Sequence, residues 1–245
     1  LPMRIFSADE VLLGEFGEER RSFAPIAEIP KVMQQAVLAI EDARFYEHSG
    51  VDYKGVLRAG LAHLSESRSQ GASTITMQVA RNFYLSTEKT VTRKIYEVLL
   101  TWKIESQLTK DQILEAYMNQ IFLGQRAYGF AAASEIYFGK PLKDVTVAEA
   151  AMLAGLPKGP SIYNPIVNPK RATARQQHII DRMVDNGFIS ADQAAAARTE
   201  KLRYRTQSEV AVHAEYVAET ARQLVFSQYG EESYARGLNV YLGID

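Results

Sequence analysis

The sequence predicts a mainly α-helical fold with a small β element near the two ends of the chain. Three observations lead to this prediction. From Pro30 onward, apolar residues recur at spacings of three and four, the period of an amphipathic helix. Three capping boxes mark helix starts within that region. The first and last segments instead alternate with the period of a strand.

The composition of the chain excludes several classes of function. The 245 residues can bury a sizeable core in one large or two small domains. A net charge of -1 leaves no electrostatic footprint for nucleic acid, which we do not expect as a partner. The absence of cysteine excludes disulfides, thiol catalysis and cysteine-ligated metal. No apolar run reaches the roughly 18 residues of a membrane span. Because the chain opens on Leu1-Pro2-Met3-Arg4, we expect a fragment of a longer protein.

The ends of the chain frame a helical domain. Residues 1–29 are interpreted as an N-terminal β arm and linker, because residues 4–23 alternate around turn signals. Residues 30–230 are expected to form the main domain, and residues 231–245 the start of a further linker. The alternating segment 237–244 is expected to pair with the N-terminal arm.

Within the domain, the helix starts follow from local chemistry. Pro30 suits a first helical turn, where its missing N–H costs nothing. A proline-rich loop, residues 157–165, separates a small-residue helix from one that starts near Pro169, and another helix is expected over about 208–229. The three capping boxes are Thr109–Gln112, Thr146–Glu149 and Ser190–Gln193.

The stretch from Glu41 to Gly50 is the first candidate site. Glu41 and Asp42 follow the apolar face of a helix and therefore lie at its C-terminal end, where the macrodipole disfavours negative charge. Such local inconsistencies tend to collect at functional sites. The alternative is that both carboxylates are solvated or paired with Arg44.

Residues 71–82 are the second candidate. Gly71 and Ala72 lead into a helix with Ser73 or Thr74 as its N-cap, and the exposed N–H groups of a helix start can bind an anion. Further donors on this helix are Gln78, Arg81 and Asn82. The alternative is a plain capped helix.

Residues 89–97 are the third candidate. Arg93 and Glu97 are four apart and share a helix face, as do Lys89 and Arg93 if the helix starts early enough. The alternative is a surface ion pair contributing roughly 0.3–0.5 kcal/mol. Two separated carboxylates, Glu41 and Glu97, suit glycosyl chemistry, and the cations between them suit a phosphate leaving group.

Five stretches, in order, resemble the signatures of the peptidoglycan glycosyltransferases (glycosyltransferase family 51), the domain of class A penicillin-binding proteins that polymerises lipid II. The first two resemble the patterns E-D-x-x-F-x-x-H-x-G and G-x-S-T-I-T-Q-Q, and the third R-K-x-x-E. The five stretches are residues 41–50, 71–78, 93–97, 110–119 and 128–140. With its flanks, the resemblance covers roughly residues 30–165.

The resemblance implies a lysozyme-like, bilobal α fold, with a large head and a membrane-facing jaw at roughly residues 51–90. Glu41 matches the general base that takes the proton of the acceptor's 4-hydroxyl, and Glu97 the carboxylate on the donor side. Inversion at the anomeric carbon would release undecaprenyl pyrophosphate and leave a β-1,4 glycan. The residues expected to contact substrate are Arg44, Ser73, Thr74, Gln78, Arg81, Asn82, Lys89 and Arg93. Met77 replaces a glutamine of the pattern and cannot donate a hydrogen bond, so we expect a peripheral role for it.

The family also implies partners and a location. The expected partners are lipid II, the growing glycan strand, the bacterial cytoplasmic membrane and the inhibitor moenomycin. The implied location is the outer, periplasmic face of that membrane. A transmembrane helix is expected before Leu1 and a transpeptidase domain after Asp245. An apolar stripe from Val51 to Leu64 could lie in the bilayer interface or pack onto the protein.

Other interpretations are weaker. Ser86–Lys89 spells S-x-x-K without the partner motifs of a transpeptidase, and Gly124–Gly129 has the glycine spacing of a P-loop without its lysine. The sequence shows no spacing typical of metal ligands, although the family resemblance leaves open a divalent cation (Mg²⁺ or Mn²⁺) near Glu97. His48 is interpreted as structural, bonding backbone near Gly50. Two alternative functions are a lytic or hydrolytic muramidase of the same fold and a non-enzymatic envelope scaffold.

Overall fold

The computed structural model describes residues 3–9, 12–16, 20–52, 73–82, 91–205, 220–221, 223–225, 227–229 and 238–243. The chain divides into two compact units, residues 1–21 with 205–245, and residues 22–204. The boundaries that the sequence suggests after residues 29 and 230 stay predictions.

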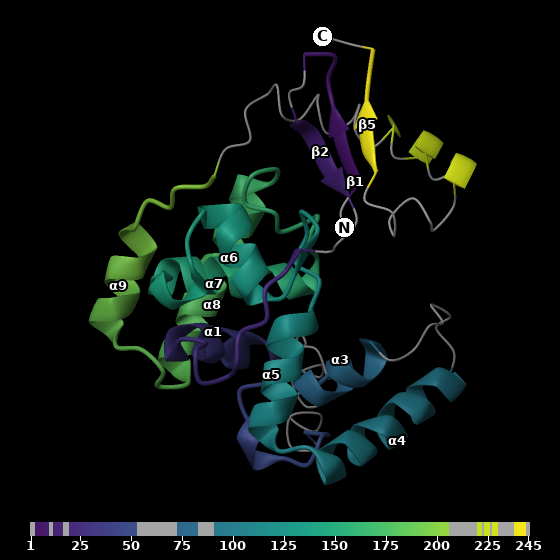
Figure 1. Ribbon diagram of the computed structural model, residues 1–245. Helices are drawn as coiled ribbons and strands as arrows, with labels where there is room; N and C mark the ends of the chain where they lie inside the picture. The colour runs from purple at the N-terminus through teal and green to yellow at the C-terminus, as the bar shows by residue number, and fades with distance from the viewer. Residues whose placement is uncertain are drawn as a thin grey trace. The chain divides into compact units, whose positions relative to one another are not determined.

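The first unit carries the β element. Strand β1 (Met3–Phe6) pairs antiparallel with β2 (Leu12–Phe16) and parallel with β5 (Asn239–Tyr241), so that the order is β2-β1-β5 (Figure 1). Ile5 is fully buried, and the rings of Phe6 and Tyr241 stack with centroids 5.1 Å apart. The predicted pairing between the two ends of the chain is therefore confirmed.

The second unit is helical, which confirms the predicted mainly α class (Figure 1). Its α-helices are α1 (Lys31–Glu41), α3 (Ile75–Asn82), α4 (Val91–Gln107), α5 (Lys110–Gln120), α6 (Phe130–Phe138), α7 (Val147–Ala154), α8 (Pro169–Asp185) and α9 (Ala191–Thr199). Its short 3-10 helices are η1 (Phe45–Glu47), η2 (Leu142–Asp144) and η3 (Leu156–Lys158), and its two-residue strand is β4 (Ala127–Tyr128). The two-residue strand β3 (Arg20–Arg21) belongs to the first unit.

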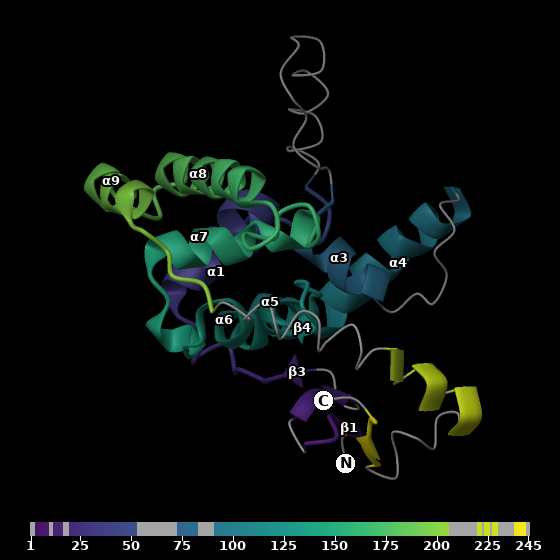
Figure 2. The same cartoon turned by 90° about the horizontal axis from the view of Figure 1, so that it is seen from above.

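The core of this unit is centred on α7. Every residue from Ala148 to Ala154 is buried, and the four alanines allow α1 and α8 to approach closely (Figure 2). The apolar face of α1, carried by Met33, Ala36 and Val37, is fully buried in the same core. Because α1 is held along its length, the position of its last residue, Glu41, is set by the core.

The helix starts agree closely with the sequence. All three capping boxes form, with the reciprocal hydrogen bonds of side chain and backbone at Thr109, Thr146 and Ser190. Pro30 is the N-cap of α1, and Pro169 is the first residue of α8. Local capping chemistry thus determines where these helices begin.

Side chains of α5 form hydrogen bonds with the backbone of the segment that precedes α1. The Asn119 side chain accepts a hydrogen bond from the Ala24 N–H at 2.8 Å and donates to the Ala24 carbonyl at 2.9 Å. Glu115 Oε2 accepts from the Ile26 N–H at 2.8 Å. Two polar residues of the fourth signature therefore satisfy partly buried backbone groups.

Part of the expected jaw and of its apolar stripe lies outside the described residues, namely residues 53–72 and 83–90. The same holds for most of the helix expected over 208–229, of which the described residues 220–221, 223–225 and 227–229 are helical. Within the described part of the chain, no helix is both long and apolar enough to span a bilayer.

Candidate active site

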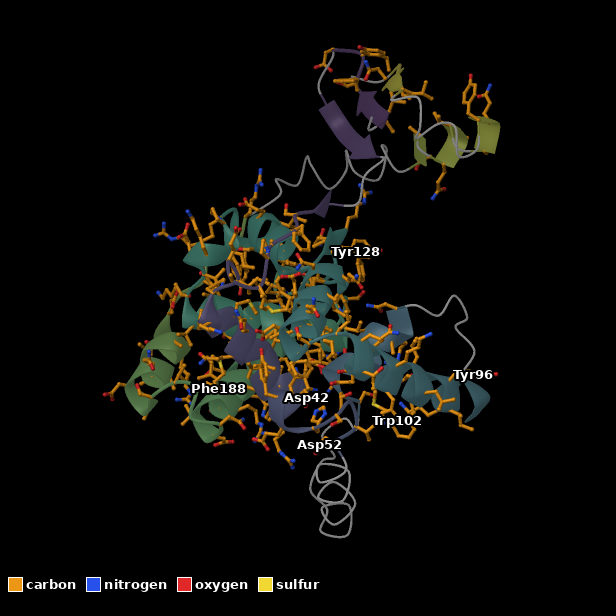
Figure 3. The ribbon with its side chains drawn as sticks, turned by 60° about the horizontal axis from the view of Figure 1, so that its bottom comes forward. Asp42, Asp52, Tyr96, Trp102, Tyr128 and Phe188 are labelled. Atoms are coloured by element: carbon orange, nitrogen blue, oxygen red, sulfur yellow. The ribbon has the colours of Figure 1, made fainter. Side chains whose placement is uncertain are left out.

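The junction between α1 and α3 is organised by Asp42. Its buried carboxylate accepts from His48 Nε2 at 2.8 and 3.0 Å and from the Ile75 N–H at 3.1 Å. Ile75 is the first residue of α3, so Asp42 lies at a helix N-terminus, where negative charge is favoured. The carboxylate that is misplaced for α1 is thus well placed for α3, and Asp42 lies inside the unit (Figure 3).

The contacts of His48 with Gly50 and Asp42 fix the tautomer of its imidazole ring. The Gly50 N–H donates to His48 Nδ1 at 3.2 Å, so Nε2 carries the hydrogen that is donated to Asp42. Gly50 has φ of +89°, and a Cβ there would lie 2.6 Å from Thr101 Cγ2 on α4, which only glycine avoids. The predicted contact of His48 with backbone near Gly50 is present, and its bond to Asp42 was not anticipated.

Glu41 is held from α3. Gln78 Nε2 donates to Glu41 Oε2 at 2.7 Å. Burial raises the pKa of Glu41 above 4.5, while the Gln78 hydrogen bond and the charges of Arg175 and Lys158 oppose that rise. The carboxylate is therefore a better proton acceptor than an exposed one.

The hydroxyl groups of Ser73 and Thr74, in the loop before α3, bond to other protein groups. Thr74 is the N-cap, because its Oγ1 accepts from the Met77 N–H at 3.2 Å, and it also donates to the Gly50 carbonyl at 2.6 Å. Ser73 Oγ accepts from Arg81 Nη2 at 3.3 Å. Met77 is buried, so it contributes packing at the position where the signature has glutamine.

Glu97 on α4 is buried beneath two exposed cations. Its side chain is 2% exposed, whereas those of Arg81 and Lys94 are 43% and 54% exposed. Lys94 Nζ donates to Oε1 at 2.8 Å, and Arg81 donates from Nη2 at 3.2 Å and from Nε at 3.4 Å. Burial alone would raise the pKa of Glu97, but these hydrogen bonds hold it below its usual value. This arrangement is more than an exposed ion pair, because the carboxylate orients cations that remain open to an anion.

Helix α3 connects the two carboxylates. Gln78, which contacts Glu41, and Arg81, which contacts Glu97, are three residues apart and share one helix face. The structure therefore brings Glu41 and Glu97 to the same face of α3, about one turn apart.

The remaining residues expected to contact substrate are Asn82, Arg44, Lys89 and Arg93. Asn82 is exposed at the end of α3. Arg44 donates from Nε to Glu47 at 2.9 Å and lies 3.4 Å from Asp52. Lys89 and the Arg93 side chain lie outside the described residues, so their predicted roles stay predictions.

A divalent cation does not fit Glu97 as it stands. Its carboxyl oxygens accept hydrogen bonds from Arg81 and Lys94, which a metal would have to displace. Among the residues that the structure describes, no three His, Cys, Asp or Glu side chains gather as a ligand set.

The sequence does not predict several residues that contact the two carboxylates or shift their pKa values. Lys94 lies inside the third signature, but only Arg93 and Glu97 are assigned a role there from the sequence. Arg175 lies partly buried beside the buried stripe of α8, between Ala172 and Ile179, and a cation next to such a stripe is a usable signal. Tyr117 lies inside the fourth signature, but its place in the apolar pattern of α5 is that of an ordinary core residue, which predicts no role beyond packing.

The chain resembles known proteins over its whole length. The profile of the family described as Transglycosylase matches residues 9–184. "Penicillin-binding protein 1A" of Neisseria lactamica is 54% identical over 243 residues, which cover 98% of this chain and 30% of the relative. "Penicillin-binding protein 1A" of Escherichia coli K12 is 48% identical over 246 residues, covering 100% and 29%. The chain thus spans about three tenths of the length of these relatives.

A solved structure shares the fold. The crystal structure of penicillin-binding protein 1A from Haemophilus influenzae matches with a TM-score of 0.58 and 32% identity. The match covers 96% of this chain and 25% of that chain.

Proposed function

We propose that this chain, which belongs to the transglycosylase family of peptidoglycan glycosyltransferases, polymerises lipid II into β-1,4-linked glycan strands. The reaction inverts the anomeric carbon of the donor and releases undecaprenyl pyrophosphate. The observation that carries this proposal is the pairing, on one face of α3, of a carboxylate with a raised pKa and a pair of oriented cations.

Glu41 is the proposed general base. It takes the proton of the acceptor's 4-hydroxyl while that oxygen attacks the donor sugar. A base works best when its pKa lies near the working pH, and burial moves the pKa of Glu41 upward in that direction. Thr74 supports this arrangement indirectly, by capping the helix that presents Gln78.

The donor's diphosphate is proposed to bind over Glu97. Arg81 and Lys94 present exposed cationic groups held by one buried carboxylate, which spares the ligand the cost of orienting them. Ser73 extends this surface through its bond to Arg81. Asn82, Lys89, Arg93 and Arg44 stay proposed contacts on the strength of the family signatures. A muramidase would have no need of this cationic surface.

Contact with the bacterial cytoplasmic membrane is proposed through α4. Ile95, Tyr96, Leu99 and Trp102 are all about half exposed, and their spacing places them on one side of this helix. Tyr96 and Trp102 are labelled in Figure 3. Aromatic and aliphatic side chains in such a stripe suit a bilayer interface. Placement at the outer face of that membrane, a preceding transmembrane helix and a following transpeptidase domain complete the proposal.

The fluorescence of Trp102, the one tryptophan of the chain, can test the membrane contact. We expect its emission to shift to the blue when phosphatidylglycerol vesicles are added, because the indole leaves water. Leu99→Asp should weaken vesicle affinity about tenfold or more, since it removes an exposed leucine that the bilayer interface would bury and adds a charge. The control Val167→Asp, at an exposed apolar residue before α8, should leave affinity unchanged. Unshifted emission in the presence of vesicles would contradict this contact.

Polymerisation of lipid II by this chain tests the proposed reaction. We expect glycan strands and undecaprenyl pyrophosphate as products, and inhibition by moenomycin. Purified glycan supplied alone should remain intact. Fragments released from that glycan, with no polymer from lipid II, would identify a muramidase, and failure of both reactions would favour a scaffold.

A further inference from the structure

Tyr117 of α5 stands behind Glu41 in a directional hydrogen-bond chain. Its fully buried hydroxyl donates to Gln78 Oε1 at 3.4 Å, and Gln78 Nε2 donates to Glu41 Oε2 at 2.7 Å. An ionised carboxylate can only accept, so Gln78 must turn its amide nitrogen toward Glu41. Its amide oxygen then faces the Tyr117 hydroxyl.

We propose that Tyr117 is a positioning residue that acts through Gln78 to hold Oε2 of Glu41, leaving Oε1 to receive the proton of the acceptor hydroxyl. This inference rests on the proposed function of Glu41 as base. In the described part of the chain, the hydrogen bond that Glu41 accepts goes to Oε2, and no described residue donates one to Oε1.

The need for an anchor follows from the chemistry of glutamine. Its side chain has three rotatable bonds, and its amide can turn over unless both ends are held. Burial, together with the charge of Glu41, raises the pKa of Tyr117 well above its usual value. The hydroxyl therefore keeps its proton and remains a donor throughout the working pH range.

The other groups that face Glu41 are unchanged by a substitution at residue 117. Asp42 at the end of α1 raises the pKa of Glu41, whereas Arg175 on α8 and Lys158 on η3 lower it. A change in the titration of Glu41 on removing the hydroxyl therefore reports on the Tyr117–Gln78–Glu41 chain.

The test is a carbon-13 NMR titration of the Glu41 carboxyl group in the chain and in Tyr117→Phe, with the resonance identified by its loss in Glu41→Gln. We expect the substitution to raise the pKa of Glu41 by about 0.5–1 unit, because part of a stabilising hydrogen bond to the charged form is lost. Gln78→Leu, which removes that bond outright, should raise it further. An unchanged pKa in either variant would overturn the inference.

Two further variants separate a specific effect from a general one. Tyr137→Phe also deletes a buried hydroxyl, which donates to the Leu123 carbonyl at 2.9 Å, and should leave the pKa of Glu41 unchanged. Tyr117→Phe added to Gln78→Leu should produce no further shift, because the connecting amide is absent. An equal shift with and without Gln78 would show that Tyr117 acts by another route.

The pH dependence of kcat/KM distinguishes this inference from the proposed function. The acidic limb of polymerisation should move to higher pH in Tyr117→Phe together with the Glu41 titration. If the titration moves while the limb stays, Glu41 is not the base and the proposed function fails at that point. If the titration stays while polymerisation proceeds, the positioning role fails and the proposed function stands.

Discussion

Glu41→Gln is expected to reduce polymerisation of lipid II by about a thousandfold or more. Glutamine keeps the shape of the side chain and can still accept the hydrogen bond from Gln78, but it cannot take a proton. A positioned general base contributes roughly 10²–10⁴ in rate, and the acceptor hydroxyl has no other base among the groups proposed to contact it. The measurement is the initial rate of strand formation at saturating lipid II.

The same substitution should leave the fold as stable as before or slightly more stable. The pKa of Glu41 is raised in the folded chain, so its ionised form is disfavoured there, and the stability it permits at low pH is lost as pH rises through that pKa. A neutral glutamine removes this penalty at neutral pH. The free energy of unfolding at pH 7 checks it, and marked destabilisation together with lost activity would point to misfolding instead of a missing base.

Glu97→Gln is the second change with a large expected effect. We expect polymerisation to fall by about 10²-fold, because Arg81 and Lys94 lose the buried charge that orients them toward the diphosphate. The substitution also increases local positive charge. If the role of Glu97 were only to tune net charge, donor binding would improve. Separate measurement of kcat and KM for lipid II distinguishes misplaced cations from a simple change of charge.

Stability should fall in the same variant, by about 1–2 kcal/mol at neutral pH, since hydrogen bonds to a charged, buried acceptor are weakened. The pKa of Glu97 is lowered by folding, so its contribution is present above the ordinary carboxyl range and lost as pH falls through the folded pKa. The difference in unfolding free energy between the two proteins should therefore shrink on acidification. A difference that grew at low pH would contradict the assignment.

Glu105→Gln is a matched control on the same helix. Glu105 accepts from Lys110 at 2.8 Å and from Thr76 of α3 at 2.5 Å, much as Glu97 accepts from a lysine and an α3 residue. It should cost stability but spare polymerisation, because it orients no exposed cation pair. Equal loss of activity in both variants would mean that α4 needs its glutamates for packing alone.

Much of the fold follows from local signals in the chain. The capping boxes at Thr109, Thr146 and Ser190 form as written, because the reciprocal hydrogen bonds involve residues only three apart. The period of the apolar residues places α1 and leaves Glu41 at its end. The pairing of the chain's ends also follows, since both ends alternate as strands and neither can satisfy its backbone alone.

The partners of the charged residues depend on contacts between distant segments. Asp42 looks misplaced at the end of α1 until the start of α3, 33 residues later, is packed against it. Glu97 is held by Lys94 of its own helix and by Arg81 of a neighbouring helix, whereas its predicted pairing with Arg93, whose side chain is outside the described part, stays a prediction. Arg175 approaches Glu41 from α8, and Tyr117 reaches it through Gln78 from α5; the spacing of residues within each helix predicts neither contact.

Residue types and their spacing along the chain were therefore sufficient to identify the family signatures, the helix boundaries and the two carboxylates. The tertiary structure decides the direction of each pKa shift. It raises the pKa of Glu41 and lowers that of Glu97. Each direction depends on burial and on the charges that packing brings within a few ångströms, and neither is encoded in any local stretch of the sequence.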